Sequence, residues 1–162
     1  MGKTLIVGLG NTILSDDAAG LLIAREVYAR VKSESVDFIE SSYAGWRCID
    51  FFPGYEKIII IDVICDPLHQ PGECFKMDLP KTIPLHRQSS HNVGFLEMLE
   101  LARQTGMVTA ARIVVYAVAA RTIYDFSEQI SEQIMNKVPD ILSEIIKNEF
   151  PGMPREGDRL YA

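Results

Sequence analysis

The chain has 162 residues, 48% hydrophobic and 23% charged, so it can bury a hydrophobic core and does not resemble a disordered segment. Its formal net charge of −6 disfavours nucleic acids and anionic membrane surfaces as partners, because both attract basic proteins. No apolar run approaches the roughly 18 residues that a membrane-spanning helix needs. The three cysteines, an odd number without a C-x-x-C pair, favour a reducing, cytoplasmic location over a secreted disulfide framework, although Cys65 and Cys74 could approach each other.

The first half of the chain predicts alternating strands and helices. An aliphatic run at residues 4–7 stops at Gly8 and is typical of a buried strand. From residue 17 to about residue 32, apolar side chains recur three and four positions apart, which predicts a helix. Residues 57–63 contain four consecutive isoleucines and predict a central strand that is buried on both faces. Residues 36–40 predict another strand and residues 44–52 a short helix.

The second half continues the alternation. After the turn at Pro71-Gly72, residues 73–79 predict a shorter strand near a sheet edge. Residues 127–150 have a helical pattern that Pro139 should kink or split. Residues 92–104 predict a helix that stops at Gly106, and residues 112–119 a buried strand.

Strands that alternate with helices predict an α/β fold of three layers, in which helices cover both faces of a mostly parallel, five-stranded sheet. The chain shows no internal repeat and no interdomain linker. We therefore expect a single domain over residues 1–150, followed by a polar tail over residues 151–162.

Ligands of open α/β sheets bind beyond the carboxyl ends of the strands, which directs attention to the loops there. The loop that begins Gly8-Leu9-Gly10-Asn11 resembles a dinucleotide-binding loop, but the third glycine is replaced by Ile13. Asp16 and Asp17 then stand at the start of the helix, where they would repel a phosphate. A nucleotide site is therefore disfavoured. Capping of the helix is the structural interpretation of Asp16, whereas capping and a functional role are equally open for Asp17.

Two further polar residues are candidates for such a site. Asp62 ends the run of isoleucines, where a buried carboxylate must be hydrogen-bonded, paired or bound to a metal. His91 immediately precedes a predicted helix, a position that is also ordinary for a structural histidine. His69 and His86 lie in loops without an adjacent acid, and we interpret both as surface residues.

Asp17, Asp62 and His91 together offer two carboxylates and one imidazole from three different loops. Oxygen and nitrogen ligands of this kind suit zinc or nickel, and three protein ligands leave positions open for water or substrate. The residues are far apart in sequence, so only the fold can bring them together.

In order and spacing, these short motifs resemble the peptidases that mature nickel–iron hydrogenases by removing a C-terminal extension from the large subunit. The resemblance extends over most of the chain. It is carried by Gly8-x-Gly10-Asn11, Asp16-Asp17-x-x-Gly20, Tyr43-Ala44-Gly45, Asp62, Pro71-Gly72 and Ser90-His91-x-x-Gly94.

The resemblance implies that Asp17, Asp62 and His91 are the metal-binding and catalytic residues. Asp16 is a further candidate, as a residue that orients these ligands. It also implies a partner, the hydrogenase large-subunit precursor, which supplies the nickel, so that the protease need hold no ion of its own. Zinc or cadmium could occupy the same site in vitro. The chain departs from the family at Ala18-Ala19 and over residues 117–126, a region expected to help recognise the partner.

Two alternatives belong to other functional classes. The chain could be a non-catalytic module that senses a metal and docks on a partner, or a nucleotide-binding domain that uses the glycine loop. Loss of mass from a nickel-loaded precursor would distinguish an enzyme from a docking module, and thermal shifts with nucleotide or with metal would separate the third possibility.

Overall fold

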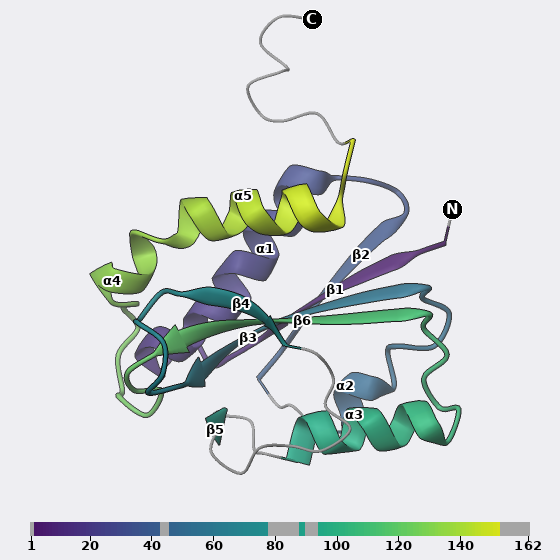
Figure 1. Ribbon diagram of the computed structural model, residues 1–162, viewed down its shortest axis with the longest axis horizontal. Helices are drawn as coiled ribbons and strands as arrows, with labels where there is room; N and C mark the ends of the chain where they lie inside the picture. The colour runs from purple at the N-terminus through teal and green to yellow at the C-terminus, as the bar shows by residue number, and fades with distance from the viewer. Residues whose placement is uncertain (1, 43–45, 78–87, 90–93, 153–162) are drawn as a thin grey trace, which may run out of the picture.

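The computed structural model describes residues 2–42, 46–77, 88–89 and 94–152. Strands and helices alternate along much of the chain, as expected (Figure 1). The strands are β1 (Thr4–Leu9), β2 (Val36–Ser41), β3 (Lys57–Cys65), β4 (Cys74–Met77), β5 (Gln88–Ser89) and β6 (Arg112–Ala120). The helices are the short 3-10 helix η1 (Ser15–Ala18), α1 (Ala19–Val31), α2 (Trp46–Ile49), α3 (Gly94–Gln104), α4 (Glu132–Met135) and α5 (Val138–Glu149).

The strands form one twisted sheet in the order β2-β1-β3-β6-β4. The first four of these are parallel, and the edge strand β4 runs antiparallel to β6. The two-residue strand β5 pairs antiparallel with the end of β3, outside this path. The prediction of a mostly parallel, five-stranded sheet is confirmed for the main path, and β5 is an addition that the sequence did not predict.

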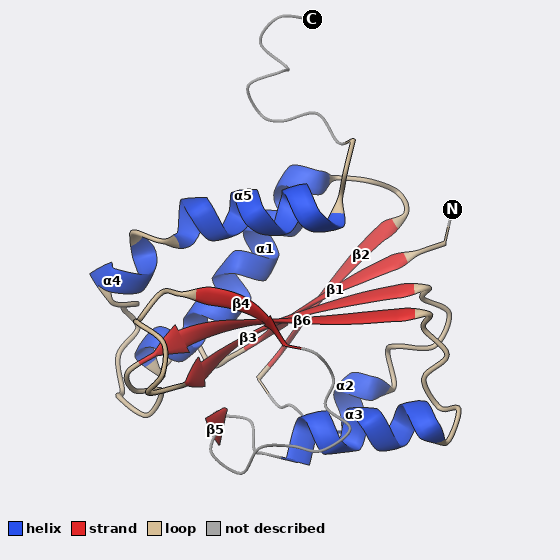
Figure 2. Cartoon of the chain, viewed as in Figure 1, coloured by secondary structure: helices blue, strands red, loops and turns tan. Residues whose placement is uncertain are grey.

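Helices cover both faces of the sheet, which confirms the three-layer architecture (Figure 2). Helices α1 and α5 lie on one face, where Ile59, Ile61 and Val63 of β3 form a core with them. Helices α2 and α3 lie on the other face, where Ile58 and Ile60 pack with α2 and α3 side chains. The central strand is therefore buried on both faces, as its isoleucines predicted.

The helical segment that was predicted for residues 127–150 is shorter and divided. Helices α4 and α5 are separate, so the predicted split is confirmed, and Pro139 lies in the first turn of α5, where a proline costs no helical hydrogen bond. Residues 127–131 are not helical because their backbone makes other bonds. Ser127 pairs with Leu14 in a parallel bridge, and the Ser131 N–H donates to Asp16.

None of the described helices is long and apolar enough to cross a bilayer.

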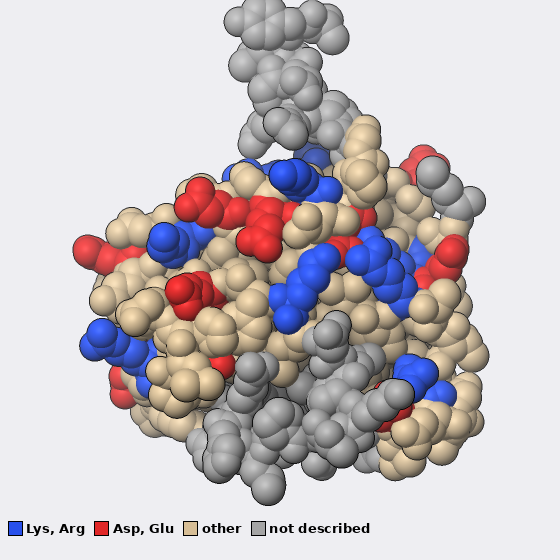
Figure 3. All heavy atoms as spheres, in the orientation of Figure 1, with Lys and Arg blue, Asp and Glu red and all other residues tan. Residues whose placement is uncertain are grey.

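All three cysteines are free thiols. Cys65 on β3 and Cys74 on β4 are separated by β6, so two strand spacings, about 10 Å, keep them from bonding. Acidic and basic side chains are interspersed over the face shown in Figure 3.

The expected domain limits, 1–150 with a tail at 151–162, stay a prediction, since residues 153–162 lie outside the described residues.

Candidate active site

Asp62 lies inside β3, which extends two residues beyond its predicted end at residue 63. The strand continues to Cys65 because β6 pairs with it through Ala120 and β5 pairs with its last two residues. Asp62 is 7% exposed and belongs to the alternate positions of β3 that face α2 and α3. It is thus a buried acid near the carboxyl end of the central strand, on the face that α3 covers.

The electrostatic environment of Asp62 disfavours its charge. Burial and the nearby carboxylate of Asp17 raise the pKa of Asp62 from 3.8 to about 8, although the Val63 N–H donates a hydrogen bond to Asp62 Oδ1 (2.8 Å) and opposes the shift. A site that holds two carboxylates this close favours a proton or a metal cation between them.

Asp17 reaches Asp62 from the 3-10 turn η1, directly before α1. It is completely buried. The close approach depends on Gly20, because a Cβ atom there would overlap the carbonyl oxygen of Leu9 and lie only 3.0 Å from that of Ile61. The glycine therefore lets α1 begin directly against the ends of β1 and β3, and so brings Asp17 beside Asp62.

Asp16 does not cap its own helix, contrary to the structural interpretation of the sequence. Its Oδ1 accepts a hydrogen bond from the backbone N–H of Ser131, at 2.7 Å, and the residue is 6% exposed. The Ser15 backbone N–H and Oγ donate to the carbonyl oxygens of Ser127 and Gln129, at 2.7 and 3.0 Å. The loop after β6 thus holds the turn that carries Asp17.

His91 lies outside the described residues, together with Ser90 and Asn92. The chain just before it is described: Ser89 of β5 pairs with Ile64, two residues beyond Asp62 on β3. The structure thus brings Asp17 and Asp62 together, while the position of the third predicted residue stays a prediction. Among the described residues, no group of three His, Cys, Asp or Glu side chains is arranged to hold a metal.

A comparison with protein families gives a match to the hydrogenase maturation protease model over residues 21–148, more than half of the chain. The chain belongs to this family. The matched range includes Asp62 and begins after Asp17.

The chain is also similar in sequence or in fold to individual members of the family. The chain is 25% identical over 108 residues to the hydrogenase 2 maturation protease of Escherichia coli K12, an alignment that covers 64% of this chain and 65% of that relative. In fold it is similar to the hydrogenase maturating endopeptidase HybD from E. coli, with a TM-score of 0.74, 19% identity, and coverage of 90% of this chain and 91% of that one. It is also similar to the [NiFe] hydrogenase maturation protease HybD from Thermococcus kodakarensis, with a TM-score of 0.72, 23% identity, and coverage of 90% and 98%.

This hydrogenase maturation protease homologue also has a cavity of about 390 Å³ beside the glycine loop. The described residues that line it include Gly10, Asn11 and Glu40, and none of them is basic. Since the charged residue among these lining residues is an acid, Glu40, the cavity does not favour the nucleotide alternative.

His69 lies in a loop and is partly exposed, but the interpretation that it has no neighbouring acid is wrong. Its Nδ1 lies 3.0 Å from Oδ2 of Asp66, a buried acid three residues earlier, and its ring stacks on Phe75. The acid at this short spacing was the signal in the sequence that could have revealed the pair.

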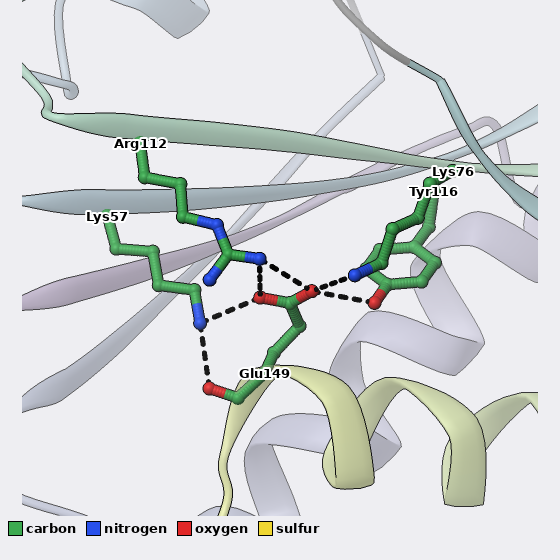
Figure 4. A network of polar contacts seen from close by, with 5 residues as sticks. All are labelled: Lys57, Lys76, Arg112, Tyr116 and Glu149. Atoms are coloured by element: carbon green, nitrogen blue, oxygen red, sulfur yellow. Dashed lines mark hydrogen bonds and ion pairs between the residues drawn. The ribbon is translucent and has the colours of Figure 1, made fainter.

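Figure 4 shows another polar network of this protease homologue, centred on Glu149. The carboxylate of Glu149, at the end of α5, accepts from Tyr116 (2.8 Å) and pairs with Lys57 (2.7 Å), Lys76 (2.8 Å) and Arg112 (3.3 Å). Because Lys57 and Arg112 are the first residues of β3 and β6, the network joins α5 to the amino ends of the strands, away from Asp62. Its role is structural.

Proposed function

We propose that this chain is an endopeptidase that removes the C-terminal extension of a hydrogenase large-subunit precursor, and that Asp17, Asp62 and His91 bind the nickel that the precursor carries. Membership of the maturation protease family supports the reaction class. The observation that carries the site is the buried pair of Asp17 and Asp62, whose mutual repulsion a divalent cation would relieve.

The donor set fits nickel or another borderline divalent ion. Carboxylate oxygens and an imidazole nitrogen are suitable ligands for zinc and nickel, and three protein ligands leave positions for groups of the substrate. On this proposal the ion arrives as part of the precursor, so the chain binds its substrate partly through it. Zinc or cadmium added in vitro would occupy the same site.

Chain connectivity supports the inclusion of His91. His91 is two positions after Ser89, whose pairing partner Ile64 lies two positions after Asp62. Two residues span at most about 7 Å, so a site that includes both Asp62 and His91 is compatible with the covalent chain. Asp62 also faces the side of the sheet that α3 covers, and His91 precedes α3 in the sequence.

Peptide hydrolysis needs a polarised carbonyl and an activated water, and a divalent ion at the scissile bond supplies both. The contribution of this chain is to hold the ion through Asp17, Asp62 and His91, and thereby to place one peptide bond of the precursor beside it. The selectivity of cleavage then follows from the position of the nickel in the precursor.

The test is incubation of the purified chain with nickel-loaded and nickel-free precursor, with the mass of the precursor as the readout. We expect a defined loss of mass with nickel, none without it, and none with Asp62→Asn or His91→Ala. The exposed Asp50→Asn is the matched control and should cleave normally. Undiminished cleavage by His91→Ala would contradict the proposed mechanism.

The same assay separates the alternatives. A non-catalytic, metal-sensing docking module would bind the loaded precursor and leave its mass unchanged, and a nucleotide-binding domain would gain thermal stability with a nucleotide and none with nickel or cadmium. We also propose that the chain acts in the cytoplasm, without nucleic-acid or membrane partners, which the free thiols and the net charge of −6 support.

A further inference from the structure

The pair of Asp66 and His69 lies in the loop that follows β3. Asp66 is 4% exposed, and its Oδ1 accepts a hydrogen bond from the Leu68 N–H (2.9 Å), which fixes the carboxylate. Its Oδ2 lies 3.0 Å from Nδ1 of His69, and the His69 ring stacks on Phe75 with 4.1 Å between centroids and 18° between planes. One ring nitrogen and one ring face are thus engaged, while 31% of the side chain is exposed.

Strand register places this histidine on the same face of the sheet as Asp62. Ala117 of β6 pairs with Asp62 on one side and with Phe75 of β4 on the other. Directly paired residues point to the same face, so Asp62, Ala117 and Phe75 form one row across three strands. Two strand spacings separate the ends of the row by about 10 Å. The His69 ring, stacked on Phe75, lies at the end of the row opposite Asp62.

The proposed reaction needs a proton donor for the leaving nitrogen of the scissile peptide bond. The amide nitrogen that leaves during peptide hydrolysis must be protonated, because an amide anion is too basic to depart. Asp17, Asp62 and His91 would have their lone pairs on the ion and no proton to offer. A histidine whose Nδ1 is held by a buried carboxylate presents its Nε2 as a proton donor and acceptor. The shared row puts this histidine on the same face of the sheet as the proposed ion.

We propose that His69 is a catalytic residue that donates a proton from Nε2 to the leaving nitrogen of the precursor, with Asp66 as its positioning residue. This inference rests on the proposed function. As the oxygen of a water molecule adds to the scissile carbonyl carbon and the C–N bond breaks, the electron pair of that bond stays on nitrogen and takes the Nε2 proton. His69 is reprotonated by the proton that the attacking water loses, so the cycle consumes one water and no other reactant.

The test is the single-turnover cleavage rate of nickel-loaded precursor by saturating amounts of the full chain. We expect His69→Ala to lower the rate about 10²–10⁴-fold while binding of the precursor is unchanged. Asp66→Asn should give a smaller loss, and Gln70→Ala, which changes an exposed side chain in the same loop, should cleave at the wild-type rate. His69→Gln, which can keep a hydrogen bond to Asp66, replaces the alanine variant if circular dichroism shows that His69→Ala does not fold.

Added imidazole provides a readout that a merely structural role would not change. It should restore part of the cleavage rate to His69→Ala and none to Asp62→Asn. Wild-type cleavage by His69→Ala, alongside an inactive Asp62→Asn, would overturn the role of His69 and leave the proposed function intact. Weakened precursor binding without imidazole rescue would overturn it as well, whereas full cleavage by both variants would refute the proposed function.

Discussion

Asp16 accepts a hydrogen bond from the backbone N–H of Ser131, which lies 115 residues later in the chain. This contact joins the turn before α1 to the start of α4. The adjacent residue, Asp17, reaches the proposed metal site from the same turn. The loop between β6 and α4 therefore supports the site without contributing one of its proposed ligands.

Replacement of Asp16 by alanine should lower the free energy of unfolding by about 1–3 kcal/mol, because a buried acceptor is lost and its N–H donor is left unpaired. The midpoint of urea denaturation measures this change. Hydrogen exchange should become faster at the Ser131 amide and in α4. Asp125→Ala removes an exposed acid from the same loop and should leave both unchanged. Equal effects of the two substitutions would show that charge, and not this contact, matters.

The strands and helices that follow from a local hydrophobic pattern could be predicted from the sequence. The isoleucines of β3 and the helical period of α1 each reflect burial against neighbours, and the structure has both elements close to their expected limits. The extent of residues 127–150 was not predictable, because their helical pattern competes with the pairing of Ser127 to Leu14 and of Ser131 to Asp16. Such long-range bonds leave no local signal in the sequence.

The candidate site also has features that the sequence indicated and features that only the folded structure shows. An acid at the end of an isoleucine run indicated Asp62, and the acids at the helix start indicated Asp17, because charge is costly in such places. Their proximity depends on Gly20, whose role appears only when α1 is packed against β1 and β3. The pairing of His69 with Asp66 was readable from their spacing, but the shared register with Ala117 needed the sheet.

Gly20→Ala should destabilise the protein even though alanine normally favours a helix by about 1 kcal/mol over glycine. The added Cβ would overlap the Leu9 carbonyl oxygen and lie 3.4 Å from the Asp62 Cα, so α1 must move away from the sheet. We expect a loss of about 1–3 kcal/mol in the free energy of unfolding and a marked loss of cleavage. Thermal denaturation measures the first effect, and a gain in melting temperature would contradict this account of Gly20.

Asp62→Asn should combine a loss of function with a gain in stability when no metal is present. Burial and Asp17 raise the pKa of Asp62 to about 8, so its charge is unfavourable in the folded protein. Near neutral pH the folded protein must keep Asp62 protonated or bear its unfavourable charge, and a neutral amide avoids this cost. We therefore expect a gain of about 1 kcal/mol or more in the free energy of unfolding. Denaturation in the presence of a chelator is the measurement. Added nickel should stabilise the wild type and not the variant, and the opposite order would contradict a metal site here.

The acid stability of the fold should depend on Glu149. Burial alone would raise the pKa of Glu149, but hydrogen bonds from Lys57, Lys76 and Tyr116 lower it from 4.5 to about 2. A carboxylate whose pKa is depressed on folding stabilises the folded state above its unfolded pKa. That contribution declines as the pH falls toward the folded value. The stabilisation is therefore complete near neutral pH and is lost between about pH 5 and pH 2.

Glu149→Gln should lower the free energy of unfolding by about 3–5 kcal/mol at pH 7, because it leaves the cations of Lys57, Lys76 and Arg112 around a neutral group. The difference from the wild type should shrink as the pH is lowered from 5 toward 2, where the wild-type carboxylate is protonated too. Urea denaturation across this pH range measures it. Glu26→Gln, which removes an exposed partner of Arg30, should change stability by less than about 0.5 kcal/mol at every pH. A difference for Glu149→Gln that did not vary with pH would show that lost packing, and not lost charge, is responsible.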